Sequence, residues 1–219
     1  MIQFTDWGLI PYSQAYEKQK LLFETAIANK ANKQPVDNIT VYCEHPHVIT
    51  VGKNGLFSNL LFPEAMLKEK GVELYHVDRG GDVTYHGQGQ IVGYPIYDLE
   101  SFNIGLKEYI HRIEEIIIKT IAEYGVVGER LDGATGVWID KDVSGRARKI
   151  AAIGVRSSRY VTMHGFALNV NTDLSYFNLI NPCGFVDKGV TSLAKEINRE
   201  VNQNEVKEIL TKYFADFFD

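Results

Sequence analysis

Cysteine is scarce in this chain of 219 residues, with Cys43 and Cys183 the two present. Two cysteines do not make a disulfide framework, so the sequence predicts a protein of the reducing cytoplasm. Apolar runs of membrane-spanning length are missing too, and the first ten residues lack the charged start and unbroken apolar core of a signal peptide. These absences argue against a secreted disulfide-rich protein and against a membrane protein.

An excess of positive charge is missing as well. The 23 lysines and arginines are outnumbered by 28 acidic residues, and the net charge of -5 argues against a nucleic-acid partner, which favours a basic surface. The sequence also shows no internal repeat and no low-complexity segment. A hydrophobic content of 45% and this length instead predict one globular domain over residues 1–219, with no membrane partner.

What the chain does contain is many strand-like segments and few helices. The clearest helix covers 106–124, where apolar residues recur at helical spacing and Gly125 is placed to end it. Strands outnumber helices and do not alternate regularly with them, which predicts an α+β domain. Helices are expected over 11–31, 62–70, 106–124 and from 204 onward, and strands over 38–51, 72–77, 136–140, 149–156 and 160–170.

We expect the site to form around the segment 149–184. Its two strands predict a hairpin that is joined over 157–159. Successive side chains of a strand point to opposite faces, and one face of each strand here carries only small residues. Glycine inside a strand marks a close approach of a ligand or another backbone, so this face predicts the floor of a site. Its members are Ala152, Gly154, Gly165 and Ala167.

Cys183 and Lys149 stand at the edges of this floor. Cys183 lies between Pro182 and Gly184, a pattern typical of a tight turn that can expose a thiol. A cysteine nucleophile needs a nearby positive charge or base, and Lys149 at the head of an apolar strand is the candidate. A buried structural cysteine and a solvated lysine at the start of a strand are the alternatives.

A second signal is the glycine-rich run RGGDVTYHGQGQ over 79–90. It is neither a phosphate-binding GxxxxGK[ST] loop nor a GxGxxG after a strand. Polar residues at this density around glycines indicate a ligand site, because paired glycines allow close approach of the backbone. The alternative is a tight turn in which His86 is satisfied by a backbone carbonyl.

Three smaller features leave two interpretations each. Cys43, His45 and His47 alternate as metal ligands on one strand face would, but Pro46 interrupts them and no fourth ligand is evident. His164 is either a donor on the pocket wall or a core histidine. A basic cluster is either a solvated hairpin or a docking surface for an acidic carrier protein. Its members are Arg146, Arg148, Lys149, Arg156 and Arg159.

Taken together, these motifs resemble the octanoyltransferases of protein lipoylation. The matching stretches run in the family's order from Glu44 to Leu193 and are long and specific. Gln88 and His47 depart from the family, which usually has proline at both places. The matches are EHP with Thr50 and Gly52, RGGDVTYHGQGQIVGYPIYDL over 79–99, KIAAIGVR over 149–156, MHGFALNV over 163–170, NPCG over 181–184 and GVTSL over 189–193.

The resemblance implies a fold shared with biotin- and lipoate-protein ligases, an α+β domain around a mixed sheet. It implies that Cys183 is the acyl-thioester nucleophile and that Lys149 lowers the pKa of its thiol. It further implies octanoyl-acyl carrier protein as donor, lipoyl domains of 2-oxo-acid dehydrogenases and glycine-cleavage H protein as acceptors, and no cofactor or metal. The implied substrate-binding residues are Arg79, Gly80, Gly81, Asp82, Val83, Thr84, Tyr85, His86, Ala152, Ile153, Gly154, Gly165, Phe166 and Ala167, with His164 as a further pocket donor.

Two other functions fit parts of the same pattern. An ATP-dependent lipoate- or biotin-protein ligase shares the fold but makes an acyl-adenylate and does not need Cys183. A catalytically silent binding protein for acyl carriers or lipoyl domains would keep the apolar slot and form no covalent intermediate. Retention of both Cys183 and Lys149 favours the transferase.

Overall fold

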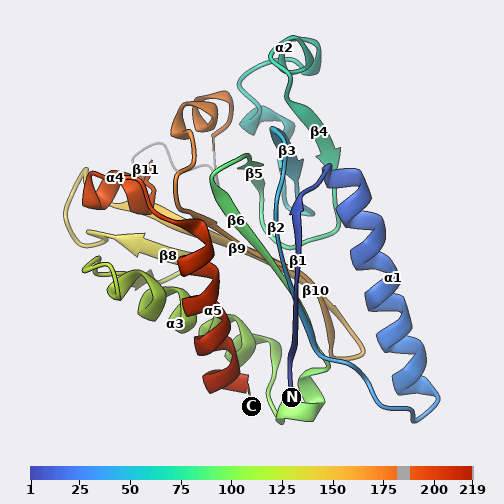
Figure 1. Cartoon of the computed structure of the whole chain (residues 1–219). Coiled ribbons are helices and arrows are strands. Elements are labelled where there is room, and N and C mark those ends of the chain that lie inside the picture. The colour runs from blue at the N-terminus through green and yellow to red at the C-terminus, as the bar shows by residue number, and fades with distance from the viewer. Residues whose placement is uncertain (182–187, 219) are drawn as a thin grey trace.

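A large mixed sheet forms the centre of the molecule (Figure 1). The computed structural model describes residues 1–181 and 188–218. Along the sheet the strand order is β1-β2-β6-β10-β9-β8-β7, with β11 beside β9. The pairs β1–β2 and β9–β11 are parallel and the other pairs are antiparallel. The strands are β1 (Gln3–Leu9), β2 (Ile39–Glu44), β6 (Gln90–Ile96), β7 (Glu129–Leu131), β8 (Ala134–Ile139), β9 (Arg148–Ser158), β10 (Val161–Asn169) and β11 (Gly189–Val190).

A second, smaller sheet lies beside the first. Its order is β4-β3-β5, with β3 (Val48–Val51) between β4 (Glu73–His76) and β5 (Val83–His86). The single strand expected over 38–51 is therefore wrong: it is split into β2 and β3, which belong to different sheets. The break falls at Pro46, which has no backbone N–H to donate to a sheet.

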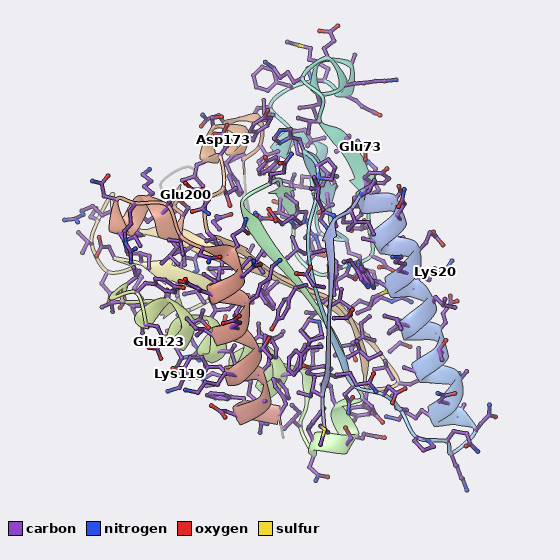
Figure 2. The ribbon with its side chains drawn as sticks, in the orientation of Figure 1. Lys20, Glu73, Lys119, Glu123, Asp173 and Glu200 are labelled. Atoms are coloured by element: carbon purple, nitrogen blue, oxygen red, sulfur yellow. The ribbon has the colours of Figure 1, made fainter. Side chains whose placement is uncertain are left out.

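Helices cover both faces of the large sheet (Figure 1). Helix α1 contacts β6 and β10 on one face, while α3 contacts β8 and β9 on the other and packs against α5. Figure 2 shows charged side chains such as Lys20 on α1 and Lys119 on α3 on the outer surfaces of these helices. The helices are α1 (Tyr12–Ala31), α2 (Glu64–Glu69), α3 (Leu106–Ala122), α4 (Leu193–Ile197) and α5 (Gln203–Phe218), with 3-10 turns η1 (Phe57–Asn59), η2 (Leu99–Phe102) and η3 (Leu174–Leu179).

The alternation of strand residues explains these layers. Phe166 and Leu168 of β10 pack in the core with α3 and α5, whereas Ala167 between them packs in the cluster on the α1 side. Ile91 and Val92 of β6 divide in the same way. A strand buried on both faces has a continuous apolar sequence rather than an alternating one.

The expected α+β architecture around a mixed sheet is confirmed. No helix in the described parts of the chain has the length and hydrophobicity needed to cross a membrane.

The expected central hairpin is formed by β9 and β10, but its turn differs from the prediction. Ser157 and Ser158 still belong to β9, and Ser158 pairs with Val161. The two turn residues are Arg159 and Tyr160, with φ of +52° and +65°. Two successive positive φ values are the geometry of a tight hairpin turn whose twist matches that of the strands.

Candidate active site

A cavity of about 590 Å³ opens where the 79–86 segment faces the β9–β10 hairpin. Of the expected substrate-binding residues, most border this cavity. Tyr85 does not: it is buried with the small sheet's apolar cluster, and its hydroxyl lies 2.8 Å from Nδ1 of His47. The expected residues on the cavity wall are Arg79, Gly80, Gly81, Asp82, Val83, Thr84, His86, Ala152, Ile153, Gly154, His164, Gly165, Phe166 and Ala167.

The small-residue face is real, and the register shows what it accommodates. Gly154 pairs directly with Gly165 and Ala152 with Ala167, so the four residues share one face of the sheet. A Cβ on Gly154 would lie 2.8 Å from the carbonyl oxygen of Gly80, and one on Gly165 would overlap the carbonyl of Gly93. All four residues border the cavity, and the two glycines in addition leave room for neighbouring backbone.

Arg79 holds the glycine-rich segment against both sheets. Its guanidinium is buried and donates from Nη2 to the carbonyl oxygen of Thr50, on β3, at 2.7 Å. The next residue, Gly80, donates its backbone N–H to the carbonyl of Val155, on β9, at 2.9 Å. This segment therefore connects the small sheet to the large one at the cavity wall.

Lys149 lies on the cavity wall near the start of β9. It is half-buried, and its Nζ donates to the carbonyl oxygen of Thr135 at 3.0 Å. The same ammonium stands 4.7 Å from the ring centroid of Trp138, the residue opposite Lys149 on β8. Cation–π attraction and the carbonyl together fix the direction of the ammonium group.

Cys183, with Pro182 and Gly184, lies outside the described residues. The chain on either side of them is described. Asn181 donates its backbone N–H to the carbonyl of Asn59 at 2.8 Å, and Lys188 borders the cavity. The chain re-enters the described structure just before β11, which pairs with β9 so that Val190 is opposite Lys149.

His164 forms a polar group with a residue that the sequence did not single out. Its Nε2 lies 2.8 Å from Oδ1 of Asp78, and Arg156 forms an ion pair with the same carboxylate. The hydrogen bond from His164 lowers the pKa of Asp78, while burial lowers the pKa of His164. His164 also has a φ of +63°, which is uncommon for a residue other than glycine. In the sequence, the one feature that could have marked Asp78 as a site residue is its position directly before the glycine-rich run.

Several cavity residues were not predicted. Tyr12 and Trp138 belong to segments without a motif, and they reach the site through tertiary packing alone. Tyr94 lies within the matching stretch 79–99 but beyond its glycine-rich part. For Asn169 a signal existed, because it lies on the small-residue face two positions beyond Ala167. Extending the alternation of that face to the end of the strand would have identified Asn169 as a site residue.

The alternating residues Cys43, His45 and His47 were considered above as metal ligands. His45 and His47 engage separate partners: Nε2 of His45 is 2.7 Å from the hydroxyl of Tyr94, whereas His47 contacts Tyr85. Within residues 1–181 and 188–218, no three His, Cys, Asp or Glu side chains are grouped so as to hold a metal ion.

Two arginines of the basic cluster, Arg148 and Arg156, form ion pairs within the fold. Arg148 donates to Glu196 at 2.5 Å and to Asp140 at 2.6 Å, so its charge is balanced inside the protein. Arg156 is paired with Asp78 in the same manner. These two arginines therefore help to hold the sheet, and the docking surface for an acidic carrier protein stays a prediction.

The family model of the lipoyl protein ligase A/B catalytic domain matches residues 17–215, and the chain belongs to this family. Among curated proteins, the chain is 57% identical over 217 residues to the octanoyltransferase of Parabacteroides distasonis. The match covers 97% of this chain and 98% of that protein. The resemblance noted from the motifs is thereby confirmed.

Two solved structures show how far the fold extends beyond close relatives. The bipartite lipoate protein ligase of Thermoplasma acidophilum has a TM-score of 0.73 at 15% identity, covering 99% of this chain and 84% of that one. A biotin protein ligase from Aquifex aeolicus has a TM-score of 0.52 at 11% identity, covering 99% and 68%. These likenesses concern the fold alone, and they confirm the expected biotin/lipoate-ligase-like fold.

Proposed function

We propose that this chain transfers an octanoyl group from octanoyl-acyl carrier protein to a lysine of lipoyl domains through a thioester on Cys183. The observation that carries the proposal is the placement of Lys149 on the cavity wall, where Thr135 and Trp138 hold its ammonium group. Lys149 also lies opposite Val190 of β11, the first strand after Cys183 in the chain. The close identity to an octanoyltransferase supports the same reaction.

In the first half-reaction the Cys183 thiolate attacks the carbonyl carbon of the donor thioester. The carbon–sulfur bond to the carrier breaks, and Lys149 gives its proton to the departing carrier thiolate. A thiolate is favoured beside an ammonium because the two charges attract, which lowers the thiol pKa. Exchange of one thioester for another is nearly isoenergetic, so this step requires no ATP and no metal.

In the second half-reaction the amine of the acceptor lysine attacks the octanoyl-enzyme. An amide forms, the bond to Cys183 breaks, and the proton lost by the amine passes to the now neutral Lys149. The pair returns to thiolate and ammonium, ready for another donor. Apolar cavity residues such as Ala152, Ile153 and Ala167 would contact the eight-carbon chain.

Mass spectrometry of the intact protein tests the proposal. After mixing with octanoyl-acyl carrier protein without ATP, the wild type should gain one octanoyl group that hydroxylamine removes, and Cys183→Ser should gain no such thioester. Cys43→Ala is the matched control, because Cys43 is fully buried in a core cluster and should not affect acylation. Transfer that appears only with ATP and free octanoic acid would identify a ligase instead.

A further inference from the structure

His86 occupies an unusual position on the cavity wall. It ends β5, its side chain is buried, and its Nδ1 lies 2.8 Å from Oε1 of Gln90. The ring is stacked parallel to that of Tyr12, with an interplanar angle of 7° and 6.3 Å between centroids. The stacked ring and the hydrogen bond fix the imidazole with its Nδ1 edge toward Gln90, and His86 lines the cavity.

The orientation of the Gln90 amide follows from its own partners. Its Nε2 donates to the carbonyl oxygen of Tyr85 at 3.2 Å and to Oδ1 of Asn169 at 2.8 Å. Asn169 is fixed in turn, because its Nδ2 donates to the carbonyl oxygen of Thr191 at 3.0 Å. A carbonyl oxygen only accepts, so each amide in this series has one allowed orientation.

The proton on His86 is therefore assigned by its surroundings. Oε1 of Gln90 only accepts, so Nδ1 of His86 must carry the hydrogen. A neutral imidazole has one N–H, and Nε2 is then an acceptor. Burial lowers the pKa of His86 to about 3, which keeps the ring neutral near pH 7. Among the described residues, none donates a hydrogen bond to Nε2.

This series of hydrogen bonds ends next to the proposed catalytic lysine. The backbone N–H of Thr191 donates to the carbonyl of Lys149 at 3.0 Å, and the carbonyl of Thr191 accepts from Asn169. The strand register agrees, because Leu168, one residue before Asn169, is opposite Ala151, two residues after Lys149. His86 and Lys149 thus border the same cavity at the same end of the β9–β10 pair.

We propose that Nε2 of His86 accepts a hydrogen bond from the amine of the incoming lysine during transfer, an inference that rests on the proposed function. The octanoyl chain and the thioester carry no N–H or O–H group, whereas the attacking amine carries N–H groups. Its nitrogen becomes positive as the bond to the carbonyl carbon forms, so a neutral acceptor binds the transition state more strongly than the ground state. Lys149, not His86, then takes the proton.

Nuclear magnetic resonance of the protein labelled with ¹⁵N-histidine tests the proton assignment without any reaction. Two-bond correlations distinguish the two neutral tautomers, and His86→Asn identifies the signal. We expect hydrogen on Nδ1 in the wild type and a mixture of tautomers in Gln90→Leu. A hydrogen on Nε2 in the wild type would overturn the proposal, whether or not any variant keeps its fold.

Single-turnover kinetics test the role. The octanoyl-enzyme is formed first and isolated, and its reaction with a lipoyl domain is then followed by mass. The matched variants are His86→Asn, which can still donate to Gln90, and His86→Gln, whose carboxamide oxygen reaches the position of Nε2. Losing a hydrogen bond to a developing charge should slow transfer about 10- to 100-fold in His86→Asn, with a substantial part restored in His86→Gln.

The outcomes separate this inference from the function on which it rests. If the wild type forms no octanoyl-enzyme, the proposed function fails and His86 is not the cause. If it forms and both variants transfer at the wild-type rate, the inference alone is overturned. Slow transfer in both variants alike would also contradict it, because the acceptor atom would then not matter. With a small amine as acceptor, His86→Asn should again be slow and His86→Gln should again be partly restored. That result would exclude lost contacts with the lipoyl domain as the explanation.

Discussion

Gly154 and Gly165 face each other across the hairpin, yet each makes room for a different neighbour. Gly165 allows β6 to approach at Gly93, whereas Gly154 allows the Arg79–Gly80 backbone to lie on β9. The carbonyl of Gly80 is close enough that even a methyl group would displace it. Gly154 thus makes room for the glycine-rich segment as well as bordering the cavity.

Gly154→Ala should therefore reduce octanoyl transfer by more than 10-fold while the hairpin still forms. The added Cβ would be 2.8 Å from the Gly80 carbonyl and 3.1 Å from Cδ of Arg79, so the segment must shift. Displacement of binding groups by about 1 Å costs on the order of 100-fold in rate. Gly105→Ala is the control, because a Cβ there meets no atom within 4 Å. Unchanged transfer by Gly154→Ala would show that the segment tolerates movement.

At the scale of elements, the tight turn between β9 and β10 requires a strained backbone conformation at both of its residues. Arg159 and Tyr160 both have positive φ, a conformation that costs residues other than glycine and asparagine on the order of 1 kcal/mol each. The side chain of Arg159 is exposed, so this position can be changed with little effect on packing.

Arg159→Asn should raise the free energy of unfolding by about 0.5–1 kcal/mol, since asparagine adopts positive φ more readily. Arg159→Val should lower it by a similar or larger amount, because a β-branched side chain is strained in this conformation. Urea denaturation of the two variants beside the wild type measures both changes. Equal stability of the two variants would mean that the turn relaxes to another type.

The same turn shows what sequence reasoning could and could not achieve. Long apolar periodicity predicts a helix over 106–124, close to α3 at Leu106–Ala122, and it predicts the hairpin strands within a few residues of their bounds. The turn was placed two residues early because Ser157 and Ser158 resemble loop residues, whereas cross-strand pairing continues through them. β1 was missed because its mixed polar pattern, typical of an exposed edge strand, resembles a loop.

The site could be predicted to a similar extent. Local motifs identified Lys149 and the glycine-rich segment, because these residues stand in unusual surroundings along the chain. They could not identify Asp78, Tyr12 or Trp138, which meet the site only through folding. The orientation of Tyr85 away from the cavity follows from the small sheet, whose existence the sequence did not reveal.

At the scale of the whole molecule, three histidines are buried near one another between α1 and the sheets. His45, His86 and His164 all have a pKa lowered by burial. An unfolded histidine has a pKa near 6.5, so below that pH the unfolded chain binds protons that the folded chain does not. Stability due to these groups is therefore present above pH ~6.5 and is lost as the pH falls toward their folded values.

Stability should accordingly decrease between pH 7 and pH 5, with His86 alone accounting for about 2 kcal/mol of the loss. Urea denaturation at several pH values measures this slope. His86→Gln should flatten it, because one titrating group is removed, whereas substitution of the exposed His111 by glutamine should leave it unchanged. An identical slope in His86→Gln and wild type would mean that the pKa of His86 is the same in the folded and unfolded states.

The segment around Arg79 also joins the sheet that carries Lys149 to the part of the fold that holds Asn181. Asn181, two residues before Cys183, is held at Asn59 on the side of the small sheet, while Lys149 belongs to the large one. The placement of Asn181 relative to Lys149 is thus a property of the boundary between the two sheets, where Arg79 binds Thr50 and Gly80 binds Val155. Sequence changes along that boundary can therefore alter the reaction rate without touching any group that reacts.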